Sequence, residues 1–386
     1  MTAEQHTPIL DDPAAMQALD KKNMLKLLHE LPEQCETALG IGRGFAMEPV
    51  AVKPNVILLV GVGDSGLAAD MACEALAEET EVPVVSRHVS DMPACIGSES
   101  IVFVIDYTGN SRTALRAYRA AQECGATTIC VTSGGRLRAA AGGPARVLSV
   151  PSGQPSRCAI GYLTLVPVAA IEKIGLAVGA IEKASHAIKL LKNTREFLRP
   201  DTRTSLNTAK QIASAIFGRA PVIYGGAGYR SLVAARWKSQ IGANGKAPAC
   251  KGTFPDIVDG EVCAWDGAGE GPCAPTFVFL TDAFDRTNEN MPLMEAAEEL
   301  LRKFGATRVE MKGATTVERM LYGAYLGDYV SYYLAMMRGI DPSEMAAVSF
   351  INEWLASTEA PRKPTQPSET EARAESGSSA DADASF

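Results

Sequence analysis

The 386-residue sequence lacks the features of a membrane or secreted protein. No apolar run approaches the roughly 18 residues that are needed to cross a bilayer. The first thirty residues contain no basic segment followed by an apolar one, so we expect no secretory signal peptide. The nine cysteines are odd in number and none is spaced as C-x-x-C, which argues against a disulfide framework or a zinc knuckle. We therefore expect a soluble cytoplasmic protein with no membrane partner.

Positive charge is also scarce, because 37 Lys and Arg residues face 45 Asp and Glu residues. The net charge of −8 predicts no broad basic surface that would bind nucleic acid. An anionic ligand would need a local pocket of backbone N–H groups and a few cations. Hydrophobic residues are plentiful at 46%, which excludes a wholly disordered chain. The length suggests two or three domains of about 150 residues.

The chain alternates short apolar runs with alanine-rich amphipathic stretches, which is typical of βαβ units that form a parallel sheet. The predicted strands are 56–60, 82–85, 101–105, 127–131, 147–150, 221–224, 276–280 and 307–311. Residues 163–217 are predicted to be helical, without a strand. The last thirty residues, 357–386, are rich in Pro, Ser, Glu and Ala, so we predict a disordered tail.

The second half of the chain repeats a feature of the first. Residues 56–76 and 222–241 both predict a strand, a G-x-G turn and a helix of small residues. At an offset of 165 residues Gly61 aligns with Gly226 and Gly63 with Gly228. This similarity suggests two related α/β subdomains, although two ordinary strand–helix turns could match by chance.

The first of these turns matches the phosphate-binding pattern G-x-G-x-x-G over residues 61–66. The second strand ends in Ser86-Arg87-His88 rather than in the acidic residue that binds the ribose of NAD, so the pattern leaves NADP as an alternative through Arg87. Tight packing of strand on helix, without a ligand, also explains the glycines.

A second polar turn follows the next predicted strand. Residues 106–113 carry Thr108, Ser111 and a Gly-Asn pair just before a predicted helix. Two such turns at neighbouring strand ends would converge on one small anionic group. Ser111 is equally suited to cap the helix, which is compatible with binding a ligand.

Six segments, in order, resemble the sugar isomerase (SIS) domain and, more narrowly, the bifunctional phosphoglucose/phosphomannose isomerase family of bacteria and archaea. They are GVGDSGLAAD (61–70), VIDYTGNSRTAL (104–115), VTSGG (131–135), PSGQPSRCAIGY (151–162), VIYGGAGYRSLVAARWKSQIGANGKAPA (222–249) and YLGDYVSYYLAMMRGIDP (325–342). The resemblance covers about residues 40 to 355.

This resemblance implies an α/β fold of two SIS-type subdomains, each a parallel sheet flanked by helices. The implied boundaries are an N-terminal helical segment over 1–40, a first subdomain over 41–200, a second over 201–356, and the tail. It also implies a cytosolic homodimer that interconverts an aldose 6-phosphate with its ketose through a cis-enediol, with a small-molecule sugar phosphate as ligand. No metal or redox cofactor is implied.

The resemblance assigns residues to the substrate. Ser65, Thr108 and Ser111 correspond to hydroxyls that cradle the phosphate, on turns that also carry Gly63 and Asp106. Arg157 stands where the family has an arginine that faces the sugar and the enediolate. A core arginine paired with an acid is the alternative for Arg157.

Several positions depart from the family pattern. Asp106 replaces a serine that helps to bind phosphate, and Ala243 replaces the glutamate that moves the proton. Asp259 stands at the position of the ring-opening histidine, and Asn352 at that of a catalytic lysine. None of the four histidines, at 6, 29, 88 and 186, lies in a matching motif.

Three hypotheses follow. In the first, the chain is an aldose–ketose isomerase in which Arg157 is the electrophile, Asp256 or Asp259 is the base, and Glu261 is a candidate for ring opening. These acids would otherwise lie in a solvated or ion-paired loop. In the second, the chain is a catalytically degenerate SIS protein that binds a sugar phosphate or related ligand. In the third, it is an NADP-dependent oxidoreductase.

Overall fold

A computed structural model describes residues 7–143, 146–267, 274–283 and 290–359. The chain forms two compact units, residues 1–343 and residues 344–386. The first unit contains two parallel sheets, and the second contains helix α15 (Ala346–Glu359). The predicted tail lies outside the described residues from 360 onward, while its first three residues end α15. The subdomain boundaries at residues 40 and 200 stay predictions.

The first sheet has the strand order β2-β1-β3-β4-β5, and all of its neighbouring strands are parallel. Its strands are β1 (Val56–Val60), β2 (Val84–Arg87), β3 (Ser100–Ile105), β4 (Thr127–Thr132) and β5 (Val147–Ser149). Its flanking helices are α4 (Leu31–Arg43), α5 (Asp64–Leu76), α6 (Arg112–Glu123), α7 (Gly135–Ala141) and α8 (Ile160–Lys173). Three short helices precede them: α1 (Thr7–Leu10), α2 (Pro13–Leu19) and α3 (Met24–His29).

The second sheet has the order β7-β6-β8-β9 and is also parallel. Its strands are β6 (Ala220–Gly226), β7 (Cys250–Phe254), β8 (Pro275–Asp282) and β9 (Ala306–Met311). Its helices are α11 (Tyr229–Ala243), α12 (Ile257–Gly260), α13 (Asn290–Leu301) and α14 (Thr316–Met337), with the 3₁₀ turns η5 (Val262–Gly267) and η7 (Arg302–Phe304). Helices α9 (Ala180–Leu198) and α10 (Thr208–Ile216), with the 3₁₀ turn η4 (Thr204–Leu206), connect the sheets.

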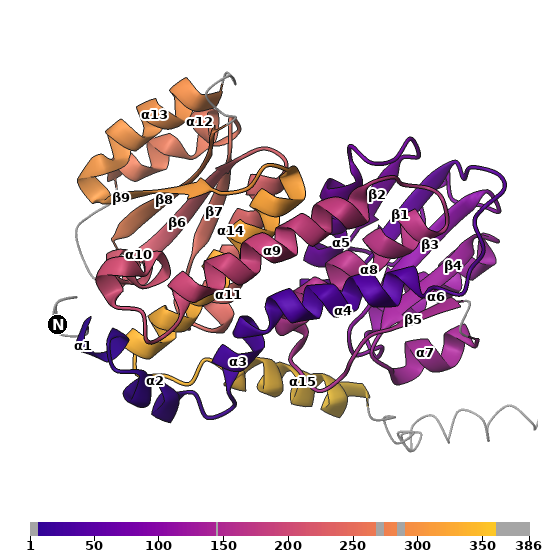
Figure 1. Cartoon of the computed structure of the whole chain (residues 1–386), viewed down its shortest axis with the longest axis horizontal. Helices are drawn as coiled ribbons and strands as arrows, with labels where there is room; N and C mark the ends of the chain where they lie inside the picture. Colours follow the sequence, from indigo (N-terminus) through magenta and orange to yellow (C-terminus); the bar gives the residue numbers. More distant parts are fainter. Residues whose placement is uncertain (1–6, 144–145, 268–273, 284–289, 360–386) are drawn as a thin grey trace, which may run out of the picture. The chain divides into compact units, whose positions relative to one another are not determined.

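Apolar side chains alternate along the strands, which gives each sheet two buried faces. Helices flank both sheets (Figure 1). In β1, Ile57 and Leu59 join one large core, whereas Leu58 and Val60 pack with residues of α6 and α7. The large core continues through α5, α8, α11 and α14 to the inner face of the second sheet. The outer face of that sheet packs on residues of α12 and α13. The predicted fold class, two parallel sheets flanked by helices, is confirmed.

Every predicted strand overlaps a strand of the structure, and the predicted helical region 163–217 contains helices and no strand. Strand β7 was not predicted, because Cys250-Lys-Gly-Thr-Phe254 at the sheet edge has no apolar run. The two repeated turns share a backbone conformation, since Gly63 and Gly228 both have positive φ angles, of 61° and 71°. The strand, turn and helix that repeat in the sequence therefore also repeat in the backbone structure.

Candidate functional site

The carboxyl ends of β1 and β3 are the expected place for a ligand in the first sheet. β1 lies between β2 and β3, so the chain passes from β1 outward to β2 and then crosses back to β3 on the other side of β1. In open α/β sheets ligands bind at such a switch point, beyond the carboxyl ends of the strands. The turns 61–65 and 106–111 follow β1 and β3 there, so the structure brings together the two polar turns that the sequence predicts.

The turn after β1 depends on its glycines. A Cβ on Gly61 would lie 2.4 Å from the carbonyl oxygen of Ser65, and Gly63 has the positive φ that favours glycine. Ser65 is buried in the first turn of α5, whereas Asp64 is half-buried at its start. The ring of His88 covers Gly66, and its Nε2 lies 3.0 Å from Asp70 Oδ1. The turn thus exposes a carboxylate at the N-terminus of α5.

The loop after β3 binds a carboxylate of its own. Asp106 Oδ2 accepts a hydrogen bond from the backbone N–H of Ser111 at 3.1 Å and one from the Thr108 hydroxyl at 3.4 Å. Burial raises the pKa of the Asp106 carboxyl above its ordinary value, although these donors and the N–H groups of Asn110 and Gly109 act in the opposite direction. The Ser111 side chain caps α6 by accepting the N–H of Ala114. Asp106 therefore occupies two donors of this loop, the Ser111 N–H and the Thr108 hydroxyl.

Tyr107 connects this loop to the segment that carries Arg157. Its hydroxyl donates to the carbonyl of Pro151 and accepts the N–H of Gln154. The segment then forms the short helix η3 (Ser156–Cys158), which packs against α5. The two turns and Arg157 are thus gathered at one edge of the first sheet.

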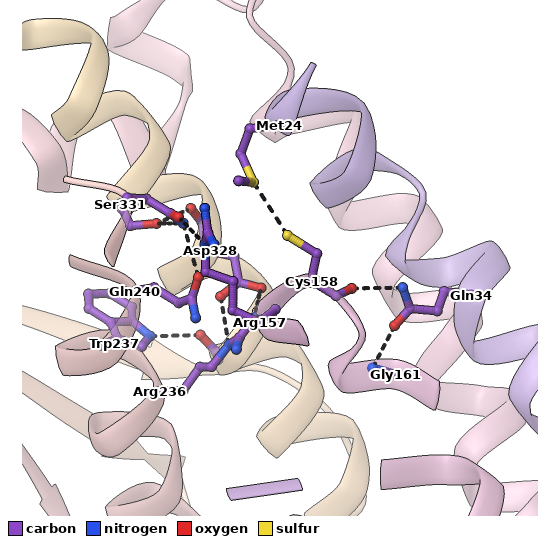
Figure 2. Close-up of polar contacts among 12 residues, drawn as sticks. Met24, Gln34, Arg157, Cys158, Gly161, Arg236, Trp237, Gln240, Asp328 and Ser331 are labelled. Carbon is purple, nitrogen blue, oxygen red and sulfur yellow. Dashed lines mark hydrogen bonds and ion pairs between the residues drawn. The ribbon is translucent and has the colours of Figure 1, made fainter. Parts of the chain in front are cut away.

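Arg157 is buried and is held by neutral acceptors (Figure 2). Its Nε donates to Asn244 Oδ1 at 2.9 Å, and its Nη2 donates to the carbonyl of Pro342 at 3.2 Å. Among the described residues, no ion pair neutralises its charge. The alternative predicted for Arg157, a core arginine paired with an acid, does not describe it. A guanidinium bound only to neutral oxygens keeps its positive charge for a ligand.

A second buried arginine supports the position of Arg157. The Nε and Nη2 atoms of Arg236 donate to the two carboxylate oxygens of Asp328, both at 2.9 Å, and Nη2 also donates to the carbonyl of Arg157 at 2.7 Å (Figure 2). The pKa of Arg236 is raised: burial alone would lower it, but the charges of Asp328 and Asp64 outweigh burial. Asp64 therefore lies within electrostatic reach of this network.

The end of α11 adds a further cation. Asn244, which holds Arg157, donates to Gln240 Oε1 and Ser331 Oγ at 3.0 Å each. Lys246 donates through Nζ to the carbonyls of Ala243 and Pro342, so two cations share the Pro342 oxygen. Sequence reasoning did not place Asn244, Lys246 or Asp328 in the site. A signal was present, because Asp328 is the only charged residue in the stretch 320–337 of α14.

The predicted acids lie elsewhere. Asp256 is exposed at the N-cap of α12 and Asp259 is exposed within this helix. Glu261 accepts a hydrogen bond from the Tyr224 hydroxyl at 2.9 Å. The Tyr224 ring belongs to the core on the outer face of the second sheet. No hydrogen bond or ion pair among the described residues connects these acids with Arg157. One copy of the chain therefore does not bring the predicted base to the predicted electrophile, and the roles of the three acids stay predictions.

Two features are absent from the described ranges. Their helices are too short or too polar to cross a membrane, and their His, Cys, Asp and Glu side chains form no group of three placed to hold a metal ion.

Burial raises the pKa of the Cys158 thiol, the neighbour of Arg157, to about 11. Cys158 is therefore a thiol and not a nucleophilic thiolate at neutral pH.

Comparison with known proteins gives consistent results. Residues 205–355 match the family model described as the bacterial phospho-glucose isomerase C-terminal SIS domain. A bifunctional phosphoglucose/phosphomannose isomerase of Caldicellulosiruptor bescii is 28% identical over 336 residues, which cover 86% of this chain and 99% of that protein. A second protein of this name, from Aquifex aeolicus, is 27% identical over 305 residues, which cover 78% of this chain and 90% of that protein.

Among solved structures, a hypothetical protein of Thermus thermophilus has the same fold, with a TM-score of 0.70. It is 15% identical, and the match covers 93% of this chain and 96% of that one. The arrangement of two parallel sheets with their flanking helices is therefore shared at low sequence identity.

Proposed function

Because the chain is a divergent member of the SIS-domain bifunctional phosphoglucose/phosphomannose isomerase family, we propose that it is a sugar phosphate isomerase. Its substrates are hexose 6-phosphates, and the reaction interconverts the aldose (glucose 6-phosphate or mannose 6-phosphate) with fructose 6-phosphate. The relatives that carry this name match nearly their whole length to this chain.

One observation in the structure carries the proposal. The buried guanidinium of Arg157 keeps its charge beside the switch point of the first sheet, and Lys246 adds a second cation at the Pro342 carbonyl. Isomerisation through a cis-enediol develops negative charge on a sugar oxygen, which fixed cations in a partly buried site stabilise. Arg157 is thus suited to the role of electrophile.

Ala243 cannot accept a proton, so another group must carry it, and a carboxylate is suited to this role. In the aldose-to-ketose direction this base takes the proton from C2 and returns it to C1, while a second proton moves from O2 to O1. Asp64 is the best candidate in one copy of the chain, because it is half-buried at the start of α5, and α5 packs against the short helix η3 that carries Arg157. Asp256 and Asp259 remain candidates only if another copy of the chain supplies them.

A coupled assay with fructose 6-phosphate, which reads glucose 6-phosphate and mannose 6-phosphate separately, tests the proposal. We expect turnover by the wild type and a loss of about 100-fold or more in kcat/KM for Arg157→Gln. Arg138→Gln, at an exposed position of α7, removes the same charge and serves as the matched control. Absence of turnover by the folded wild type refutes the proposal.

The base is identified separately. Asp64→Asn is expected to abolish turnover while Asp256→Asn and Asp259→Asn retain it. The opposite pattern assigns the proton transfer to α12 and refutes the role of Asp64. Melting curves of each variant exclude loss of the fold as the cause.

The second candidate function is a catalytically degenerate protein that binds a sugar phosphate. Ala243 specifically favours it, because that position carries no group that can move a proton. Binding of fructose 6-phosphate, measured as heat stabilisation, together with no turnover would establish this function.

A further inference from the structure

The loop between β3 and α6 has the architecture of an anion site. It follows a buried parallel strand and leads into the twelve-residue helix α6, whose first N–H groups point toward the loop. It also lies at the switch point of the sheet, where ligands of this fold class bind. A phosphate at this position would accept hydrogen bonds from the loop amides and the Thr108 hydroxyl.

Two of those donors are already used by the chain. Asp106 Oδ2 accepts both the Ser111 N–H and the Thr108 hydroxyl. The fixed carboxylate thus stands where an incoming phosphate oxygen would bind. The half-buried Asp64, at the start of α5 in the neighbouring turn, adds a second negative charge to this edge.

A related contact is made at the second sheet by Glu74, a residue of α5. At the turn after β6, Glu74 Oε1 accepts the backbone N–H of Tyr229, the first residue of α11, at 3.0 Å. Gly228 leaves room for this contact, because a Cβ there would lie 2.9 Å from Glu74 Oε1. In each sheet a carboxylate of the chain therefore occupies a helix-terminal donor at the carboxyl edge.

We propose that the Asp106 carboxylate competes with the phosphate group of the ligand for the donors of this loop. It thereby limits how much more tightly the site binds a phosphorylated sugar than the free sugar. Phosphate reaches the loop donors only when the Asp106 carboxylate leaves them. This inference rests on the proposed function for the identity of the sugar, but its effect on phosphate binding is independent of turnover.

Calorimetric titration at pH 7.5 tests the proposal with inorganic phosphate, fructose 6-phosphate and fructose. The variants are Asp106→Ser, which removes the carboxylate, and Asp106→Asn, which keeps an oxygen to accept the Ser111 N–H. Glu123→Gln is the matched control, because it removes one negative charge at the exposed opposite end of α6.

We expect Asp106→Ser to bind inorganic phosphate and fructose 6-phosphate at least about 30-fold more tightly than the wild type, which corresponds to about 2 kcal/mol. Asp106→Asn keeps a neutral oxygen on the Ser111 N–H but loses the charge, so we expect a smaller gain of at least about tenfold. Affinity for fructose should stay within about threefold of the wild type, which would show that the gain comes from the phosphate. Glu123→Gln should change none of these affinities beyond the same limit. If Asp106→Ser does not fold, Asp106→Asn alone decides the result.

Equal phosphate affinity in the wild type and in Asp106→Asn would overturn the inference, as would an equal gain in Glu123→Gln. These outcomes are distinct from failure of the proposed function. Wild type without turnover but with a phosphate gain in Asp106→Asn refutes the isomerase and supports the competitor. Turnover by the wild type without a gain in phosphate affinity in Asp106→Asn supports the isomerase and refutes the competitor.

Discussion

The substitution Asp328→Asn tests the network that holds Arg157. Asp328 lies in α14 and pairs with Arg236 of α11 through two hydrogen bonds of 2.9 Å. The side chain of Arg236 is 0% exposed and that of Asp328 is 3% exposed. Because Arg236 Nη2 also donates to the carbonyl of Arg157, the variant should affect both the stability of the chain and the position of Arg157.

The expected loss of stability is large for a single substitution. Removing one partner of a buried ion pair leaves the other charge buried and unpaired, which costs about 3–5 kcal/mol. Asparagine retains one oxygen that can accept from Arg236, so we expect about 3 kcal/mol, at the lower end of this range. A unit of 343 residues unfolds with an entropy of about 0.7 kcal/mol/K, so this loss corresponds to a fall in Tm of about 4 °C.

Urea unfolding and thermal melts of the full chain measure this loss. Glu299→Gln is the matched control, because Glu299 pairs with Arg302 while the side chains are 67% and 70% exposed. An exposed pair contributes about 0–1 kcal/mol. The double variant Arg236→Met/Asp328→Leu should recover part of the loss, since it leaves no buried charge.

Two results would refute this reasoning. One is a loss in Asp328→Asn that is no larger than that in Glu299→Gln. The other is a double variant that is less stable than Asp328→Asn, because the cost would then come from packing and not from the unpaired charge.

Two further predictions concern other parts of the first unit. Burial and the charges of Arg195 and Arg199 lower the pKa of His29 below 6.5. The unfolded chain therefore binds a proton more readily than the folded chain, and the stability should fall as the pH falls below 6.5. Urea midpoints at pH 7.5 and 5.0 should differ more in the wild type than in His29→Asn, and equal differences would contradict this assignment. Gly327→Ala would place a Cβ 2.2 Å from the buried Trp237 ring and should cost about 1–3 kcal/mol. Gly242→Ala on α11 meets nothing within 4 Å and should stabilise by about 0.5–1 kcal/mol, so a loss in both variants would exclude crowding as the cause.

Most of the fold could be predicted from local patterns. A buried parallel strand such as β1 is a continuous apolar run, and the turn after it needs glycine at Gly61 and Gly63 whatever the rest of the chain does. Strand β7 could not be predicted in this way, because it has no continuous apolar run. Its Cys, Lys, Gly and Thr form a strand only because β6 supplies the hydrogen bonds at its side.

The candidate site was only half predictable. The turns 61–65 and 106–111 are local strand–helix junctions, so the sequence placed them at one edge of one sheet. The direction of Asp106 was not predictable, because its carboxylate is oriented by hydrogen bonds within the folded loop. The expectation that Asp256, Asp259 or Glu261 would serve Arg157 remains untested, and one copy of the chain keeps these residues apart from it.

The sequence by itself determined the strands, the two glycine turns and the family resemblance, because these depend on periodicity and backbone conformation over short distances. Only the tertiary structure decided what surrounds Arg157. Its partners Asn244 and Pro342 lie 87 and 185 residues away along the chain, and they meet it because α11 packs on both α5 and α14. Burial among neutral oxygens, which leaves the charge of Arg157 for a ligand, is a property of that packing.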